Sequence, residues 1–300
     1  MPAILLSVLI TFLFLENFRT WEKTVKKINY RNKQVITAGG VVFVIVAILT
    51  NIYNAVIIKY HPISESLILA AAGMGFSGLL DDVYGSNAAK GLKGHFSELF
   101  RGRITTGSIK AVMGLAVAYL ISLKKGGSLL EVVVNALIIA LTANLLNLMD
   151  LRPGRACRFF LFSTAILFFY FLFVENTSLI AWFLPLVASA MVFLIYDSKE
   201  IVMMGDTGAN VLGMSLGVEI AWGTSFNVRV SVLVLLIGIH LLAEHYSITR
   251  IIERISMIRK NFVMYEGEIY DKIKRGSSSR RPGREAGNTG TSRRSRRRKG

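Results

Sequence analysis

Two adjacent carboxylates, Asp81 and Asp82, end a stretch of membrane-compatible sequence that reads GMGFSGLLDDVYG over residues 73–85. An ionised carboxylate is very costly to bury without a partner, so this pair must face water, a metal or another cation. Each carboxylate also raises the proton affinity of the other unless positive charge lies nearby. Mg²⁺ with a substrate phosphate is a common solution, because Mg²⁺ is usually held by one or two carboxylates. Taken alone, the pair is equally consistent with a helix end at a membrane surface.

A polar stripe ends a second apolar run. Asn144, Asn147 and Asp150 recur at every third residue in TANLLNLMDLRPGR. On a helix these positions fall within an arc of roughly 120°, so they share one face. Amide side chains are costly in lipid unless they are hydrogen-bonded, and the stripe therefore predicts a wet cleft. The alternative is a set of polar contacts between helices.

A third acidic position is Asp206, in MMGDTGANVLGMSLG (residues 203–217), where we expect a helix to start near Gly208. The alternatives are an N-cap of that helix and a ligand site, since helix N-termini attract anions. Further along the same run, Gly213 and Gly217 form a GxxxG pattern that predicts close helix packing. Lys110 lies about two turns into another apolar run, so it either reaches the membrane interface or faces a polar cavity.

Composition places the chain among membrane proteins. Of its 300 residues, 53% are hydrophobic and 18% are charged, whereas about a quarter are charged in a soluble domain. We predict an all-α polytopic membrane protein with about nine transmembrane helices, the first retained and not cleaved. A single cysteine, Cys157, excludes an internal disulfide and a cysteine-based metal cage. The apolar runs cover 2–18, 38–58, 65–80, 104–122, 129–147, 158–174, 178–196, 208–222 and 228–248.

Three parts follow from the changes in composition along the chain. Residues 1–250 form an integral membrane domain, and 251–275 predict a basic amphipathic surface helix. Residues 276–300 carry nine Lys and Arg against one Glu and predict a disordered polybasic tail. We expect this tail to contact anionic membrane lipids, and nothing in the sequence indicates specific nucleic-acid binding.

Positive charge predicts the orientation. The stretch 19–33 carries six Lys and Arg, and basic loops stay cytoplasmic. The amino terminus is then expected outside and the carboxyl terminus in the cytoplasm. All six aspartates fall on the cytoplasmic side by this assignment, although acidic residues contribute little to orientation. Of the 35 basic residues, those on the opposite side are Lys59, Lys124, Lys125 and Arg229.

Four features stand in a fixed order along residues 1–250: a basic loop ending in Gly39-Gly40, a span ending in Asp-Asp, a span ending in Asn-x-x-Asn-x-x-Asp, and Gly-Asp-x-Gly opening a span. This series resembles the polyprenyl-phosphate N-acetylhexosamine-1-phosphate transferases, which include the phospho-N-acetylmuramoyl-pentapeptide transferases of bacterial peptidoglycan synthesis. The resemblance implies transfer of a sugar-1-phosphate from a UDP-sugar to a membrane polyprenyl phosphate, with release of UMP. It also implies Mg²⁺, or Mn²⁺ in its place, and a site on the cytoplasmic face of the bacterial inner membrane. It leaves room for a homodimer.

The same resemblance assigns roles to individual residues. Asp81, Asp82 and Asp206 would be the catalytic carboxylates, the first two beside the lipid phosphate. Asp206 and Asp150 would be the metal ligands. Phosphoryl transfer depends on positioning and charge neutralisation, so carboxylates with Mg²⁺ and Lys suffice. The substrate-binding residues it implies are Asn147, Asp150 and Lys110.

Two departures from the family pattern keep other hypotheses open. The Asn-x-x-Asp motif usually continues Gly-Leu-Asp-Gly, but residues 151–154 read Leu-Arg-Pro-Gly, so the second Asp is missing. The family's late loop of clustered histidines is also absent, with His245 the last histidine. One alternative is a non-catalytic homologue that binds polyprenyl phosphate as a scaffold. A lipid transporter is the other, although its coupling residues would lie near the bilayer midplane, often in inverted repeats.

The orientation is open to a direct test. Reporter fusions at residues 90 and 200 should report a cytoplasmic location, because the Lys and Arg asymmetry places both loops on that side. A matched fusion at residue 126, in the short segment between the predicted spans 104–122 and 129–147, should report an outside location. An outside location for residues 90 and 200 would contradict the assignment.

Overall fold

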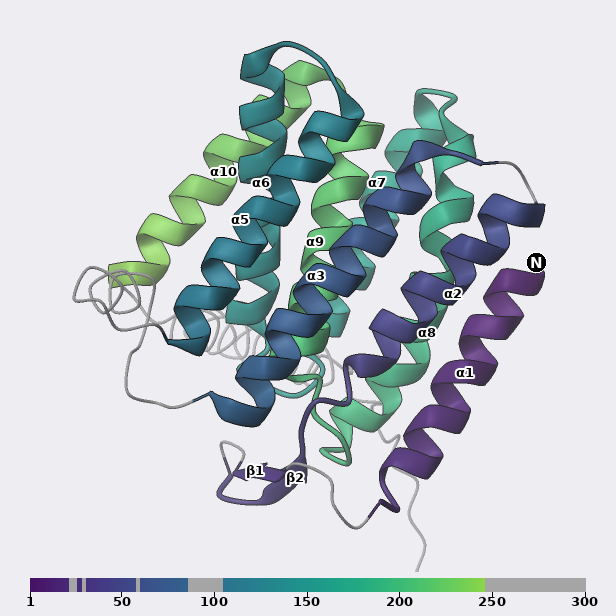
Figure 1. Ribbon diagram of the computed structural model, residues 1–300, viewed down its shortest axis with the longest axis vertical. Coiled ribbons are helices and arrows are strands. Elements are labelled where there is room, and N and C mark those ends of the chain that lie inside the picture. The colour runs from purple at the N-terminus through teal and green to yellow at the C-terminus, as the bar shows by residue number, and fades with distance from the viewer. Residues whose placement is uncertain (22–25, 29–30, 58–59, 86–104, 246–300) are drawn as a thin grey trace, which may run out of the picture. The chain divides into compact units, whose positions relative to one another are not determined.

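A computed structural model of the chain describes all residues except 22–25, 29–30, 58–59, 86–104 and 246–300. The chain divides into two units, Met1–Ile248 and Thr249–Gly300. The second unit lies outside the described residues, and so do the expected surface helix and polybasic tail. The described part of the first unit consists of nine α-helices, one short 3₁₀ turn and a two-stranded hairpin (Figure 1).

Each of the nine apolar runs forms one helix, and the ends agree to within a few residues. The largest difference is at the end of α3, which continues past residue 80 to Tyr84. Helix α9 begins at Gly205 and places Asp206 inside its first turn, whereas the sequence suggested a start near Gly208. The helices are α1 Pro2–Phe18, α2 Val41–Ile57, α3 Pro62–Tyr84, α5 Thr106–Lys125, α6 Leu129–Met149, α7 Arg155–Phe173, α8 Ile180–Ser198 (after the 3₁₀ turn η1, Thr177–Leu179), α9 Gly205–Gly223 and α10 Phe226–His245.

Six of the described helices are long and apolar enough to cross a membrane: α3, α5, α6, α7, α8 and α10. These helices make the protein a membrane-embedded, polytopic helical protein. The shorter helices α1 and α2 are also apolar, at 17 residues each. Helix α9 is not among the six, and its side chains from 207 to 221 are all buried. It therefore packs against other helices of the bundle along this stretch, and the total of nine spans stays a prediction.

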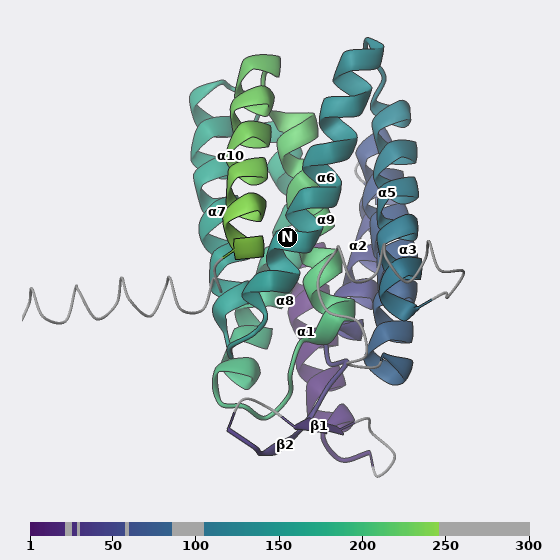
Figure 2. The same ribbon diagram turned by 90° about the vertical axis from the view of Figure 1, so that its left-hand side faces the viewer.

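Helix α9 lies inside the bundle, between α3, α6 and α7 (Figures 1 and 2). A Cβ atom added at Gly213 would lie 2.6 Å from the Cα of Ala143, and one at Gly217 would lie 2.6 Å from the Cα of Ile139. Both neighbours belong to α6, so the GxxxG pattern is confirmed as a packing face. Small residues let two helix backbones approach closely in lipid, where van der Waals contact drives association.

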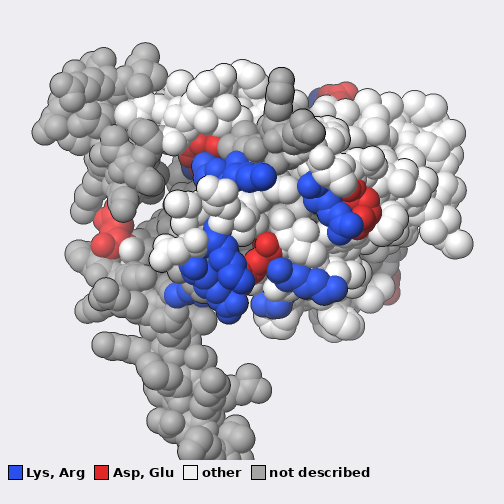
Figure 3. All heavy atoms as spheres, turned by 90° about the horizontal axis from the view of Figure 1, so that it is seen from below, with Lys and Arg blue, Asp and Glu red and all other residues white. Residues whose placement is uncertain are grey.

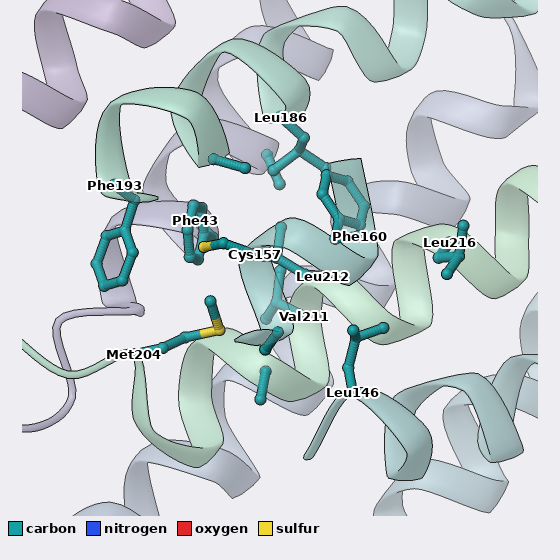
Figure 4. Packing of buried hydrophobic residues seen from close by; sticks show 14 of the residues in the cluster. Phe43, Leu146, Cys157, Phe160, Leu186, Phe193, Met204, Val211, Leu212 and Leu216 are labelled. Carbon is teal, nitrogen blue, oxygen red and sulfur yellow. The ribbon is translucent and has the colours of Figure 1, made fainter. Parts of the chain in front are cut away.

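A hydrophobic cluster packs along α9 from Ala209 to Ile220 (Figure 4). The rings of Phe43 and Phe193, from α2 and α8, lie 4.9 Å apart by their centroids. Cys157 and Phe160 of α7 are fully buried in the same cluster, together with Leu212 of α9. Dense packing of this kind fixes the depth and rotation of α9, and with them the position of its amino-terminal end.

A β-hairpin was not expected from the sequence. Strand β1, Lys26–Ile28, pairs in antiparallel register with β2, Gln34–Ile36. Strand β2 is tied in turn to the segment that leads into α9. Ile36 forms a parallel bridge with Val202, and the N–H of Met203 donates to the carbonyl of Ile36 at 2.7 Å. The hairpin and the start of α9 are therefore held together by backbone hydrogen bonds.

The Gly39-Gly40 pair continues this attachment. The N–H groups of Gly39 and Gly40 donate to the carbonyls of Met203 and Met204, at 3.1 and 3.0 Å. A Cβ atom at Gly40 would overlap the backbone of Gly208. The two glycines therefore let the chain approach the start of a neighbouring helix, α9, closely.

We expect Gly40→Ala to lower the free energy of unfolding by about 1–3 kcal/mol, because the added methyl group would push α2 away from α9. The matched control is Gly238→Ala in α10, where an added Cβ meets nothing within 4 Å. That change should be neutral or slightly stabilising, since Ala favours helix. Circular dichroism in detergent during heating measures both. Equal melting temperatures for the two variants would contradict the packing assigned to Gly40.

Candidate active site

The polar residues singled out in the sequence lie at one end of the bundle. Helices α3, α6 and α8 end there, and α5 and α9 begin there. In Figure 1 this is the lower end, which also carries the hairpin. Figure 3 views it from below and shows Lys and Arg side chains around acidic ones. Helices that run in opposite directions bring these ends together, although the polar residues lie far apart in the sequence.

Lys110 joins two of the carboxylates. Its Nζ atom lies 3.2 Å from Asp81 Oδ2 and 2.8 Å from Asp206 Oδ2. Three helices, α3, α5 and α9, thus contribute one group each to a single cluster. The side chains of Lys110 and Asp81 are both 18% exposed. Two partly buried carboxylates converge on one cation, and this marks a point where positive charge is strongly favoured.

Asp82 points away from that cluster and holds the first turn of α9. Its Oδ1 atom accepts a hydrogen bond from the N–H of Asp206 at 3.0 Å. Its Oδ2 atom accepts from the N–H and the hydroxyl of Thr207, at 3.0 and 2.7 Å. The free N–H groups of a helix start need such acceptors, and negative charge there is favourable. Asp82 is 2% exposed and positions Asp206, whereas Asp81 faces Lys110.

The backbone around this cap requires glycine. Gly205 has φ +70°, in the left-handed region that glycine adopts without strain. A Cβ at Gly205 would lie 2.6 Å from Asp82 Oδ2. A Cβ at Gly78, one turn before Asp82, would lie 2.6 Å from the Cα of Thr207. The small residues of α3 and α9 therefore let a carboxylate reach a helix terminus directly.

Asp150 follows α6 and faces further acidic groups. Burial raises the pKa of the Asp150 carboxyl well above its usual value, and the nearby carboxylates of Asp197, Asp206 and Asp82 raise it further. The backbone of Gly205 works against this by hydrogen bonding to the carboxylate. A hollow opens beside Asp150. It is lined by Asp150, Leu151, Arg152, Pro153, Asp197, Glu200 and Met203.

Asp197 is a member of this hollow to which sequence reasoning assigned no role. Its Oδ2 atom accepts a hydrogen bond from the N–H of Gly154 at 2.8 Å, and it is almost fully buried. Asn147 lies one turn before Asp150 and is partly buried. Within the part of the chain that the structure describes, the contacts that join Lys110 with Asp81 and Asp206 do not include Asn147.

Lys27 is a second residue that sequence reasoning missed. It lies on β1, with its Nζ atom 3.7 Å from Asp82 Oδ1 and 3.5 Å from the carbonyl oxygen of Asp81. Only the position of the hairpin brings Lys27 to the site, and the two three-residue strands carry no sequence pattern that predicts this hairpin.

The donor set suits a magnesium ion. No cluster of three Asp, Glu, His or Cys side chains suited to a metal occurs in the part of the chain that the structure describes. Mg²⁺ does not need one, because it takes one or two carboxylates and completes its shell with waters and substrate phosphates. Asp81 and Asp206 already converge on one cation, the ammonium of Lys110, and Asp150 is close enough to Asp206 for the charge of Asp206 to raise its pKa.

Fold and site together define a class: a polytopic membrane protein with carboxylates and a lysine gathered at one end of its helices. A family model, that of glycosyl transferase family 4, matches residues 65–223, just over half of the chain. The chain belongs to glycosyl transferase family 4. It is a glycosyl transferase of the polyprenyl-phosphate sugar-1-phosphate transferase kind, as the ordered motifs indicated. Among functionally curated proteins, none matches the chain.

The cap on α9 predicts a difference between two substitutions. Thr207→Val removes the hydroxyl that donates to Asp82 and should lower the free energy of unfolding by about 1.5–3 kcal/mol, the range for hydrogen bonds to charged groups. Thr207→Ser keeps the hydroxyl and is the matched control. Thermal unfolding in detergent compares them. If Val is tolerated as well as Ser, the hydroxyl does not contribute to the cap.

Proposed function

We propose that this protein transfers a sugar-1-phosphate from a UDP-sugar of the UDP-N-acetylhexosamine type to a membrane polyprenyl phosphate. The products are a polyprenyl-diphosphate sugar and UMP, made in the course of cell-wall or surface-glycan synthesis. The observation that carries the proposal is the cluster of Asp81, Asp206 and Lys110. Its groups come from three helices and meet within 3.2 Å of one ammonium, in a chain that belongs to a transferase family.

The reaction needs charge control more than covalent chemistry. An oxygen of the lipid phosphate attacks the phosphorus that carries the sugar, and a new P–O bond forms. The bond from that phosphorus to the oxygen bridging the diphosphate breaks, and UMP leaves with the electron pair. Both reactants are anions, so bringing them together requires cations, and positioned charges supply most of the rate enhancement in phosphoryl transfer.

Each residue of the site has a place in this scheme. Asp206 and Asp150 would hold Mg²⁺, which neutralises charge on the diphosphate when it is bound. Asp81 would serve the attacking lipid phosphate, since it lies at the end of a membrane-length helix. Lys110 would donate to a substrate phosphate in place of one of its two carboxylate partners, because its ammonium can donate to carboxylate and phosphate oxygens alike.

Asp82 and Asn147 complete the scheme. Asp82 holds α9 in register through Thr207, so that Asp206 stays aimed at the cluster. Asn147 would contact the nucleotide-sugar diphosphate, together with Asp150 one turn further on. The membrane end of a helical bundle suits such a reaction, since a lipid phosphate and a soluble nucleotide can meet there. We place this end on the cytoplasmic face of a bacterial inner membrane.

The direct test uses the purified full chain with undecaprenyl phosphate, Mg²⁺ and a set of radiolabelled UDP-N-acetylhexosamines. We expect a lipid-linked labelled product and one UMP for each sugar transferred, both lost when EDTA is added. Binding of undecaprenyl phosphate without any product, over the whole set of UDP-sugars, would favour a scaffold role instead.

Variants separate the metal ligand from the lipid-phosphate residues. Asp206→Asn keeps the size but removes the charge of a Mg²⁺ ligand. It should lower kcat by roughly 100-fold or more, and raised Mg²⁺ should restore part of the rate. Asp81→Asn and Asp82→Asn should lower kcat without such rescue. Glu175→Gln is the control. Helix α7 begins at the site end of the bundle and Glu175 follows its other end, so this exposed carboxylate lies far from the site. Metal rescue at Asp81 but not at Asp206 would reverse the two roles.

A further inference from the structure

The hairpin carries a lysine, Lys27, to the Asp81–Asp82 pair. Strand β1 holds Lys27 opposite Val35, and Val35 is buried. Strand β2 is bonded to the backbone at Val202 and Met203, just before α9. The position of Lys27 is therefore set by the same segment that sets the position of Asp206.

Lys27 is not needed by the carboxylate beside it. Asp82 already accepts three hydrogen bonds from Asp206 and Thr207. The distance of 3.7 Å from Lys27 Nζ to Asp82 Oδ1 is longer than a hydrogen bond. The Lys27 side chain is 42% exposed although Asp82 is 2% exposed, and water around the ammonium screens its attraction to the carboxylate. Stability of the fold thus gives no sufficient reason for an ammonium at this point.

Charge at the site supplies a reason. Asp81 and Asp206 both contact Lys110, and Asp82 is bonded to the backbone of Asp206 beside them, so three carboxylates lie near one closely held ammonium. An approaching phosphate adds more negative charge. A second ammonium on the solvent side of the cluster reduces this repulsion, and a lysine donates to phosphate oxygens as a mobile point charge.

We propose that Lys27 binds a phosphate group of the substrate beside the Asp81–Asp82 pair, and that the hairpin is a substrate-binding element. The proposal rests on the proposed function for the identity of the phosphate compound. Lys27 lies outside residues 65–223, where the family model matches. Two substrates could supply the phosphate: the polyprenyl phosphate and the nucleotide diphosphate.

The test compares three variants of the full chain. Lys27→Gln removes the ammonium, Lys27→Arg keeps a cation, and Lys26→Gln makes the same charge change one residue away. Successive side chains of a strand point to opposite faces, so Lys26 is a matched control on the far side of β1. Equilibrium binding of undecaprenyl phosphate and of UMP, each with Mg²⁺, is measured separately by tryptophan fluorescence in detergent.

We expect Lys27→Gln to weaken the binding of one probe by roughly fivefold to tenfold, the effect of losing one charge-assisted hydrogen bond. Lys27→Arg and Lys26→Gln should stay within about twofold of the unmodified protein. A loss confined to undecaprenyl phosphate places Lys27 at the lipid phosphate, and a loss confined to UMP places it at the nucleotide. Melting temperatures of the two Gln variants should agree.

Equal affinities for Lys27→Gln and Lys26→Gln would overturn the proposal, and so would a loss of affinity matched by a loss of thermal stability. Binding is measured without turnover, so the two proposals fail separately. A Lys27 effect in a protein that makes no lipid-linked sugar would remove the transferase reaction and leave the phosphate contact. Unchanged binding and turnover in Lys27→Gln would remove the phosphate contact and leave the transferase reaction.

Discussion

The contact between Asp82 and the first turn of α9 is the constraint on which the site depends. A buried carboxylate accepts three hydrogen bonds from a helix start, and in doing so joins the end of α3 to the beginning of α9. An unpaired charge in that position would be very costly. The α9 donors need an acceptor as much as Asp82 needs donors. Each therefore stabilises the other, and Asp206 and Asp81 are held on the two sides of Lys110 as a result.

Close backbone approach makes this contact geometrically available. Glycines at 78, 205 and 208 leave room where α3 and the Gly39-Gly40 segment meet α9, and any side chain there would collide with backbone or carboxylate. The apolar cluster around Phe43, Phe160 and Leu212 supplies the packing that keeps α9 at one depth. Polar contacts at the end of the bundle and apolar contacts along it thus act on the same helix. The match to glycosyl transferase family 4 begins in α3 and ends in α9, the two helices that this contact joins.

Among the groups of the site that contact one another, carboxylates outnumber lysines. This excess of negative charge favours the binding of a cation. Lys110 compensates two carboxylates, while Asp150 stays among Asp197, Asp206 and Asp82 with its pKa raised by burial and by their charge. Under the proposed function, such a cluster would hold a divalent cation that binds the substrate phosphates. A bundle end that meets both membrane and water suits a reaction between a lipid and a soluble nucleotide.

The sequence by itself determined the helices, because an apolar run of membrane length has few alternatives to a helix in lipid. It also determined that Asp81, Asp150 and Asp206 belong to one end of the bundle, since successive spans alternate in direction. Only the tertiary structure decided which carboxylate of the Asp81–Asp82 pair faces the cluster, because that choice depends on Thr207, far away in the chain. The hairpin, the place of Lys27 and the earlier start of α9 were likewise decided by contacts between distant segments, which local patterns do not encode.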